Sequence, residues 1–221
     1  MTSRCIMVIG VPRSGTSATA GVLHRAGVPM ERLSMGRNAI NPRGYFEDLA
    51  WKRANARLAG QRYHLIVPDS VPPEAVERYR VLAGEYQTAR LWGMKDPRLC
   101  VTARYIWPLL DQVRIVAVRR DADTVVKSIM SQSRILKQPV GEATARSLIT
   151  RWVGLMDETL DLWGGEVMEM QYEDLVADPL RHAGRLCEFA AGGLDIRLQP
   201  RRGAEFIDPR LDHRGRHPRA Q

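Results

Sequence analysis

A short glycine-containing loop near the start of the chain constrains the fold more than any other stretch. Residues 6–9 are apolar, residues 10–15 read Gly-Val-Pro-Arg-Ser-Gly, and residues 16–20 read Thr-Ser-Ala-Thr-Ala. This order predicts a strand, a tight loop and a helix. Glycine lets successive backbone N–H groups point inward, and the N-terminus of the following helix adds positive charge at the same point. The loop therefore predicts a phosphate-binding site.

The loop departs from the nucleotide-binding P-loop at one position. Residues 10–17 fit the pattern G-x-x-x-x-G-K-[ST], except that Thr16 occupies the place of the lysine. A P-loop kinase or ATPase uses that lysine to contact the terminal phosphates beside a magnesium ion. Here the cation, Arg13, lies inside the loop instead. The pattern favours an anion site built around Arg13; a turn that merely joins a strand to a helix is the alternative.

The composition fits one globular domain that binds an anion. The chain has 221 residues, 44% of them hydrophobic and 26% charged, which is ordinary for a single domain. Its net charge of +8 suits a nucleotide, a sulfated sugar or a nucleic acid. Half of that charge lies after residue 196, where seven arginines accompany three acids. We expect one domain over residues 1–195 and a basic tail over residues 196–221, which is a solvated end, a nucleic-acid patch or a wall of the anion site.

Cysteine usage and the apolar runs predict the compartment. Cys5, Cys100 and Cys187 lie far apart and lack metal-ligand spacing. They indicate buried thiols in a reducing environment, without a disulfide framework or a zinc site. The first strand begins almost at once, and no apolar run approaches the length that spans a bilayer. We therefore expect a cytoplasmic protein with no metal and no membrane partner; a Golgi enzyme reduced to its catalytic domain is the alternative.

Strand and helix patterns alternate along the chain. Helices are expected over residues 16–26, 48–60, 74–90, 99–107, 121–130, 142–162 and 179–190, and strands over residues 6–9, 91–94, 113–118 and 167–172. This alternation predicts a three-layer α/β fold of the P-loop type, with a central, mostly parallel sheet flanked by helices. The helix over residues 142–162 should bury Leu148, Trp152, Met156 and Leu160, or Leu155 in place of the last. Residues 28–44 hold too many glycines and prolines for one element, and residues 61–73 are expected to form a surface loop.

Polar residues follow the predicted strands where chemistry is expected. Ligands of such sheets bind beyond the carboxyl ends of the strands. Arg13, Lys95 and Arg120 each follow a strand, and Glu173 and Asp174 follow the fourth. These side chains should therefore meet at one edge of the sheet.

Three further segments carry the candidate chemistry. Arg120 precedes a helix that holds Ser128 eight residues later, and an arginine with a hydroxyl near a helix N-terminus can hold a second phosphate. Lys95 lies in Trp-Gly-Met-Lys-Asp-Pro-Arg, where it could neutralise charge on a transferring group. Glu47 lies in the segment Asn-Pro-Arg-Gly-Tyr-Phe-Glu-Asp over residues 41–48 and could accept a proton. The alternatives are a capped surface helix, a surface lysine and an acid that only stabilises a helix N-terminus.

Taken in order, these segments resemble sulfotransferases that use 3′-phosphoadenosine 5′-phosphosulfate (PAPS), especially the bacterial and tyrosylprotein types. The likeness spans residues 5 to about 190 and includes Gln-Tyr-Glu-Asp-Leu over residues 171–175. Ala122 replaces a usual proline. Pro97 stands where the cytosolic aryl and steroid enzymes carry their catalytic histidine, so the base must lie elsewhere.

The resemblance implies a role for each residue. Pro12, Arg13, Ser14, Gly15, Thr16 and Ser17 would bind the 5′-phosphosulfate, Arg120 and Ser128 would bind the 3′-phosphate, and Lys95, Arg13 and Glu47 would be catalytic. His64 and Asp96 remain alternative bases. A sulfuryl group would pass to a hydroxyl or amine of a small molecule, carbohydrate or peptide, held by residues 28–90, and adenosine 3′,5′-bisphosphate (PAP) would be released. A small-molecule kinase and a nucleotide- or nucleic-acid-binding protein are the other hypotheses. The sequence does not indicate the acceptor or the oligomeric state.

Overall fold

A four-stranded, wholly parallel sheet forms the centre of the protein. We describe it from a computed structural model that covers residues 2–36, 38, 41–61 and 64–208, with the backbone alone for residues 61 and 64. The strand order is β4-β1-β5-β6. These strands are β1 (Arg4–Gly10), β4 (Leu91–Lys95), β5 (Gln112–Arg119) and β6 (Val167–Gln171). The expected parallel sheet is confirmed.

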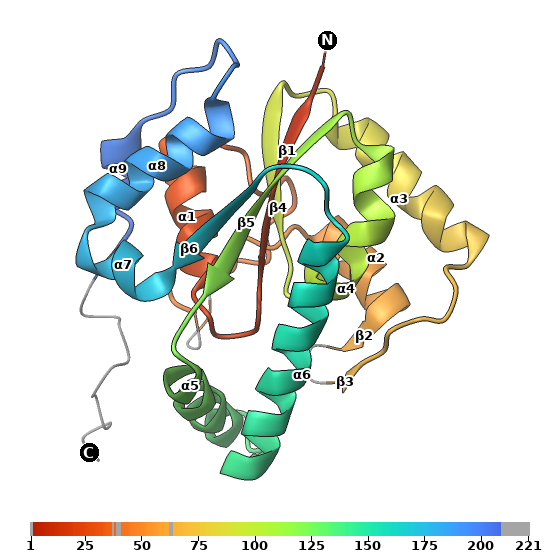
Figure 1. The fold of residues 1–221 in the computed structure, drawn as a ribbon, viewed down its shortest axis with the longest axis vertical. Coiled ribbons are helices and arrows are strands. Elements are labelled where there is room, and N and C mark those ends of the chain that lie inside the picture. The colour runs from red at the N-terminus through yellow and green to blue at the C-terminus, as the bar shows by residue number, and fades with distance from the viewer. Residues whose placement is uncertain (1, 37, 39–40, 62–63, 209–221) are drawn as a thin grey trace.

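Helices cover both faces of the sheet, which confirms the three-layer α/β fold (Figure 1). Side chains alternate along β1, so Cys5, Met7 and Ile9 join one buried cluster while Ile6 and Val8 join the other. The first face carries α2 (Leu49–Ala59), α3 (Pro73–Tyr86), α4 (Leu99–Ile106), α5 (Ala122–Ile135) and α6 (Glu142–Asp161). The second carries α1 (Thr16–Ala26), α8 (Pro179–Ala191) and α9 (Pro200–Ala204).

Local capping explains where several helices begin and end. The side chains of Asp48, Asp121 and Asp178 accept backbone N–H groups at the starts of α2, α5 and α8. Gly27 ends α1 with φ of 116°, a left-handed conformation that favours glycine. The helices expected from residues 121, 179 and 16 onward are thus confirmed, each with a cap at one end. The expected burial of all three cysteines is also confirmed.

The structure corrects four expected details. Helix α3 ends at Tyr86 rather than near residue 90, since the chain turns after residue 86 toward β4, beside which Arg90 O accepts the N–H of Arg4. The expected loop over residues 61–73 begins instead with a small antiparallel pair, β2 (Gly60–Gln61) and β3 (His64–Leu65). Strand β6 stops before Tyr172, which opens α7 (Tyr172–Ala177). A short 3-10 turn, η1 (Trp107–Leu109), follows α4 at Pro108.

The core stripe of α6 is shifted from the expected one. Its buried residues include Trp152, Leu155 and Met156, whereas Leu148 and Leu160 are only half-buried. Leu155 was the expected alternative to Leu160, and Ile149 takes the place of Leu148. The reason is that α6 packs against both α4 and α5, so its apolar face is wider than one narrow stripe.

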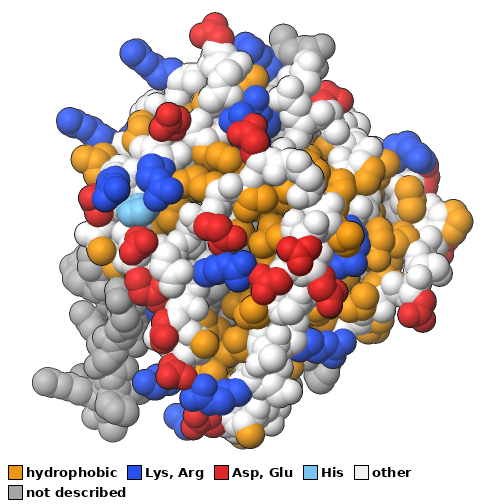
Figure 2. All heavy atoms as spheres, viewed as in Figure 1, with side chains coloured by type: hydrophobic (Ala, Val, Ile, Leu, Met, Phe, Trp, Pro, Cys, Tyr) orange, Lys and Arg blue, Asp and Glu red, His pale blue; other side chains and the backbone are white. Residues whose placement is uncertain are grey.

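The segment after α8 returns to the second face of the sheet. Helix α9 packs on α1 and α8, and Ile196, Leu198, Phe206 and Ile207 pack against the second buried cluster. Residues 209–221 of the predicted basic tail lie outside the described residues. On the face drawn in Figure 2, basic and acidic side chains are mixed rather than gathered by sign. Arg119, for example, pairs with Asp157 at 2.8 Å and with Glu169 at 2.9 Å.

No helix among residues 2–36, 38, 41–61 and 64–208 is long and apolar enough to cross a bilayer.

Candidate active site

The glycine loop joins β1 to α1 at the carboxyl end of the sheet, as the sequence predicts. A Cβ atom at Gly10 would lie 2.6 Å from the Thr16 methyl group and 2.8 Å from the carbonyl of Val118. Gly15 has φ of 99°, and a Cβ there would overlap the ring of Tyr172. Helix α1 has no acidic residue in its first turn and no side-chain cap. Its positive end therefore faces the loop without an internal counter-charge.

A cavity of about 240 Å³ lies over this loop. The loop residues from Pro12 to Ala18 form its floor, apart from Ser14, which is fully buried beneath them. Glu47 and Lys95 lie on one side, Arg120 and Tyr172 on another, and residues 206–208 close it from the C-terminal segment. The predicted strand-end residues Arg13, Lys95 and Arg120 therefore do meet at one edge of the sheet.

Arg13, Arg120 and Ser128 form one connected group at this cavity. Arg13 has φ of 74°, and its Nε donates to Ser128 Oγ at 2.9 Å. Arg120 donates to the carbonyl of Arg13 at 3.2 Å. Its guanidinium lies 4.3 Å from the ring centroid of Tyr172, a cation–π contact, and 3.8 Å from Glu173. Two arginines and a hydroxyl thus converge beside the loop, although Ser128 does not itself line the cavity.

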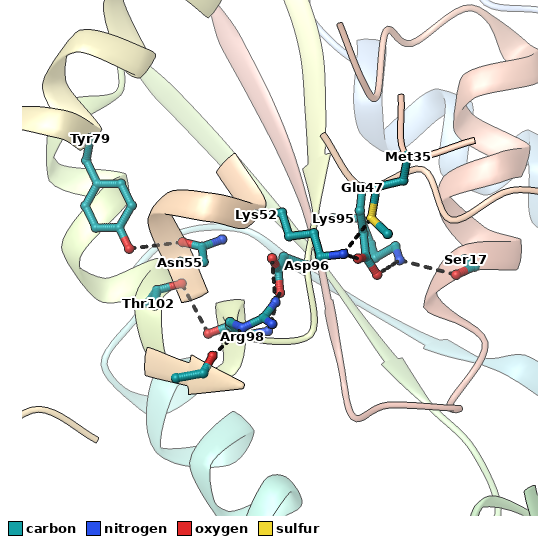
Figure 3. A network of polar contacts seen from close by, with 11 residues as sticks. Ser17, Met35, Glu47, Lys52, Asn55, Tyr79, Lys95, Asp96, Arg98 and Thr102 are labelled. Atoms are coloured by element: carbon teal, nitrogen blue, oxygen red, sulfur yellow. Dashed lines mark hydrogen bonds and ion pairs between the residues drawn. The ribbon is translucent and has the colours of Figure 1, made fainter. Parts of the chain in front are cut away.

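Glu47 and Lys95 form a second group, which is almost fully buried (Figure 3). Lys95 Nζ donates to Glu47 Oε1 at 2.7 Å and to Ser17 Oγ at 3.2 Å. Lys52 approaches Glu47 Oε2 at 4.0 Å from the first turn of α2. One lysine therefore connects a carboxylate to the second residue of α1, at the wall of the cavity.

The neighbouring acid, Asp48, has a purely structural arrangement. Its carboxylate caps α2 through Ala50 N and accepts the N–H groups of Arg32 and Leu33 at 2.7 and 2.9 Å. Burial raises the pKa of Asp48, but hydrogen bonds led by that of the Leu33 N–H outweigh it, so the pKa lies below its ordinary value. The helix-stabilising role therefore belongs to Asp48, and Glu47 is left facing the cavity.

The two other candidate bases differ in placement. Asp96 is buried, and both of its oxygens accept from Arg98 NH1, at 3.0 and 3.1 Å. Burial raises the pKa of Asp96 even though the Arg98 guanidinium opposes the shift. Asp96 does not line the cavity. The side chain of His64 lies outside the described residues.

Several residues at the cavity had no assigned role in the sequence interpretation. Arg43 and Phe206 share a cation–π contact at 4.7 Å, and Tyr172 packs on Gly15 and Arg120. Tyr172 carried one usable signal, because it directly follows a strand in a parallel sheet. Lys52 also had one, since it lies one helical turn beyond Asp48. Within the described part of the chain, no group of three or more His, Cys, Asp or Glu residues could hold a metal ion.

The fold and the cavity define a P-loop-type α/β protein with a cavity over the glycine loop at the end of its first strand. A sequence profile described as the sulfotransferase family matches residues 5–195. Because that match spans most of the chain, the chain belongs to the sulfotransferase family, and the protein is an enzyme, a sulfotransferase. No curated protein sequence matches it.

Solved structures of sulfotransferases share the fold. The sulfotransferase domain of the olefin synthase from Synechococcus PCC 7002 is 18% identical, with a TM-score of 0.55, over 94% of this chain and 82% of that one. A sulfotransferase from Mycobacterium tuberculosis is 16% identical, with a TM-score of 0.56, over 93% and 71%. One from Alicyclobacillus acidocaldarius is 13% identical, with a TM-score of 0.56, over 90% and 85%.

Proposed function

We propose that this sulfotransferase takes its sulfuryl group from PAPS and transfers it to a hydroxyl or amine, releasing PAP. The family generally uses this donor, and the cavity offers a place for each end of it. The observation that carries the proposal is the bridge made by Lys95, which donates to Glu47 at 2.7 Å and to Ser17 at 3.2 Å. That bridge joins a proton acceptor to the anion-binding loop.

The donor's 5′ end belongs at the loop. Backbone N–H groups over residues 12–17, together with Arg13, Thr16 and Ser17, would bind the phosphosulfate at the positive end of α1. The transferred group carries less charge than a phosphoryl group, in keeping with Thr16 in place of the P-loop lysine. Lys95 lies where it can neutralise charge that develops on the bridging oxygen as the sulfur–oxygen bond of the donor breaks.

Glu47 is the proposed general base. As the acceptor oxygen or nitrogen forms its bond to sulfur, its proton passes to Glu47, and the electron pair of the broken bond stays on the 5′-phosphate of PAP. Glu47 lines the cavity and contacts Lys95, whereas Asp96 is occupied by Arg98. The acceptor therefore approaches from the side formed by residues 41–47, within the region 28–90 proposed to bind it.

The 3′-phosphate is assigned to Arg120 and Ser128. Arg120 lines the cavity, and its contact with the Arg13 carbonyl places the guanidinium next to the loop. Ser128 accepts from Arg13 in the present arrangement. Binding of a 3′-phosphate would therefore compete with that hydrogen bond or add a second one to the same hydroxyl.

Further features bear on the location, the acceptor and the alternative functions. A cytoplasmic location fits three buried cysteines without a disulfide. A small molecule, carbohydrate or peptide can supply the acceptor group. A kinase is disfavoured by Thr16, which stands in place of the P-loop lysine. Nucleic-acid binding finds no gathered basic patch on the face drawn in Figure 2.

Calorimetry with PAP, and separately with ATP and magnesium, tests the donor. We expect PAP to bind at least ~10-fold more tightly, because ATP has no 3′-phosphate and the loop has no P-loop lysine. Preference for ATP would support a kinase, and equal indifference to both would support a binding protein; either result contradicts the proposal.

The Arg120→Ala variant locates the 3′ site. The variant should bind PAP ~10-fold more weakly or worse, since a charge-assisted hydrogen bond is lost. Its affinity for adenosine 5′-phosphate should change little. Arg80→Ala, an exposed arginine on α3, is the matched control and should alter neither. Equal losses for both nucleotides in Arg120→Ala would remove the proposed 3′ site.

A further inference from the structure

A second pocket adjoins the donor cavity and shares Arg43, Gly44 and Phe206 with its wall. Its volume is about 350 Å³. It lies between the C-terminal half of α1, the loop that follows α1 and the segment that follows α9. None of the residues that we assign to the donor lines it.

Three buried side-chain atoms of residues that line this pocket have no hydrogen-bond partner among the described residues: His24 Nδ1, Glu31 Oε2 and Arg43 NH1. A buried polar group without a partner costs ~1–3 kcal/mol, so native structures rarely keep one unless a ligand or water satisfies it. One atom comes from α1, and the other two come from the connection between α1 and α2. Their meeting in one pocket indicates a site for a polar group.

The charges of the lining residues select a neutral ligand. Arg25 and Arg43 are balanced by Glu31 and Glu205. An anion would meet Glu31, and a cation would meet Arg43. A hydroxyl group can donate to the carboxylate and accept from the guanidinium, so it satisfies both residues at once.

Aromatic rings line the same pocket. The ring of Phe46 lies 5.4 Å from that of His24 and 5.3 Å from that of Phe206, and Arg43 lies over Phe206. Phe206 borders both cavities. A sugar ring has an apolar face and hydroxyl groups around its edge. Its apolar face can pack on the aromatic rings while its hydroxyls contact the polar atoms of the pocket.

We propose that this pocket binds one neutral sugar unit of the acceptor, with Glu31 accepting its hydroxyl protons and Arg43 donating to its oxygens. The acceptor role rests on the proposed function, because it places a sugar next to the cavity where transfer occurs. Binding energy from such a non-reacting unit can hold the reacting hydroxyl near Glu47. The acceptor class is then a glycan or a glycosylated molecule.

Titrations followed by protein NMR test the pocket in the full chain. The probes are D-glucose, D-galactose and N-acetyl-D-glucosamine, with glycine betaine as the zwitterionic comparison. We expect saturable shifts of the Gly36 and Gly44 amides with at least one sugar and weaker effects of betaine. Absence of saturable shifts with all three sugars, or tighter binding of betaine, would overturn the proposal.

Substitutions at Glu31 test whether the sugar binds in this pocket. Glu31→Ala and the isosteric Glu31→Gln should each lower the affinity for the sugar by at least ~10-fold, because a hydrogen bond to a charged group is lost. Glu77→Ala, which removes an exposed carboxylate on α3, should not. Unchanged sugar affinity in the folded Glu31 variants overturns the proposal. PAP affinity, measured on the same samples, tests the donor assignment separately from the sugar site. Failure of the wild type to bind PAP would contradict the donor assignment but not the sugar site.

Discussion

The buried pair of Lys95 and Glu47 is poorly explained as a device that stabilises the fold. Both side chains are 3% exposed or less, and removing water from two charges costs several kcal/mol before their attraction compensates. Two hydrophobic residues could fill the same space at no such cost. The pair instead lies on a cavity wall and contacts the anion-binding loop through Ser17. Its position is thus better explained by chemistry than by packing.

Glu47→Gln tests that explanation. The amide keeps the shape but cannot accept the acceptor's proton, so kcat should fall by ~10²-fold or more. The affinity for PAP should stay within ~3-fold, because Glu47 is not a donor-binding residue in the proposal. Steady-state kinetics with a sulfated product assay, and calorimetry with PAP, measure the two quantities.

Asp96→Asn is the matched comparison, since it removes a buried carboxylate next to Lys95 that does not line the cavity. It should lower stability, because Arg98 loses a charged partner, yet leave kcat of the folded protein closer to the wild-type value. If Asp96→Asn abolished turnover while Glu47→Gln preserved it, the two assignments would have to be exchanged.

At this scale, the sequence predicted positions better than contacts. Arg13, Lys95 and Arg120 could be placed together because parallel strands bring their carboxyl ends to one edge. The hydrogen bond from Arg13 to Ser128 could not be predicted, since it depends on the left-handed backbone of Arg13. Nor could Phe206, which reaches the cavity only through the packing of the segment after α9.

At the scale of elements, Asp48 fixes how α2 presents Glu47. Its carboxylate holds the start of α2 and also the loop at Arg32 and Leu33, which lie far back along the chain. One side chain thus ties the start of a helix to the loop that follows α1. This arrangement explains why Glu47, directly before the cap, has a defined direction.

Asp48→Asn should lower the free energy of unfolding by ~1–2 kcal/mol at pH 7. Asparagine can still cap α2, but the amide nitrogen that replaces Oδ2 cannot accept the N–H groups of Arg32 and Leu33. The pKa of Asp48 is lowered in the folded protein, so its charge stabilises the fold above the ordinary carboxyl pKa of 3.8. That contribution is lost as the pH falls through the lowered value. The difference between wild type and variant, measured by urea denaturation from pH 7 to pH 3, should therefore shrink at the acid end. A difference that stays constant with pH would show that the charge of Asp48 is not involved.

Asp178→Asn is the control for that series, because Asp178 caps α8 with a single N–H group, that of Arg181. Asp178→Asn should lower the free energy of unfolding by less than Asp48→Asn does. The sequence predicted both helices, over residues 48–60 and 179–190, and both are confirmed. It missed β2 and β3, since two-residue strands carry too little alternation to be recognised.

At the scale of the whole molecule, net charge and local charge act differently. The chain carries +8 in total, yet its surface mixes both signs where Figure 2 shows it. The cavity is more uniform, because Arg13, Arg43, Lys95 and Arg120 all line it beside Glu47 and Asp208. Low-dielectric walls focus such a field toward the opening. The four basic residues that line the cavity therefore favour capture of a small polyanion there.

The salt dependence of the association rate tests whether the charge of the cavity attracts the nucleotide. Stopped-flow measurements should show that the association rate of PAP falls by ~10-fold or more between low ionic strength and ~0.5 M, because screening shortens the reach of the cavity's field. Adenosine 5′-phosphate, with one phosphate fewer, should show a shallower dependence, and dissociation rates should change less for both. Equal slopes for the two nucleotides would mean that the second phosphate does not enter the field of Arg13 and Arg120. In that case the assignment of a separate 3′ site would fail on kinetic grounds, whatever the equilibrium affinity of PAP.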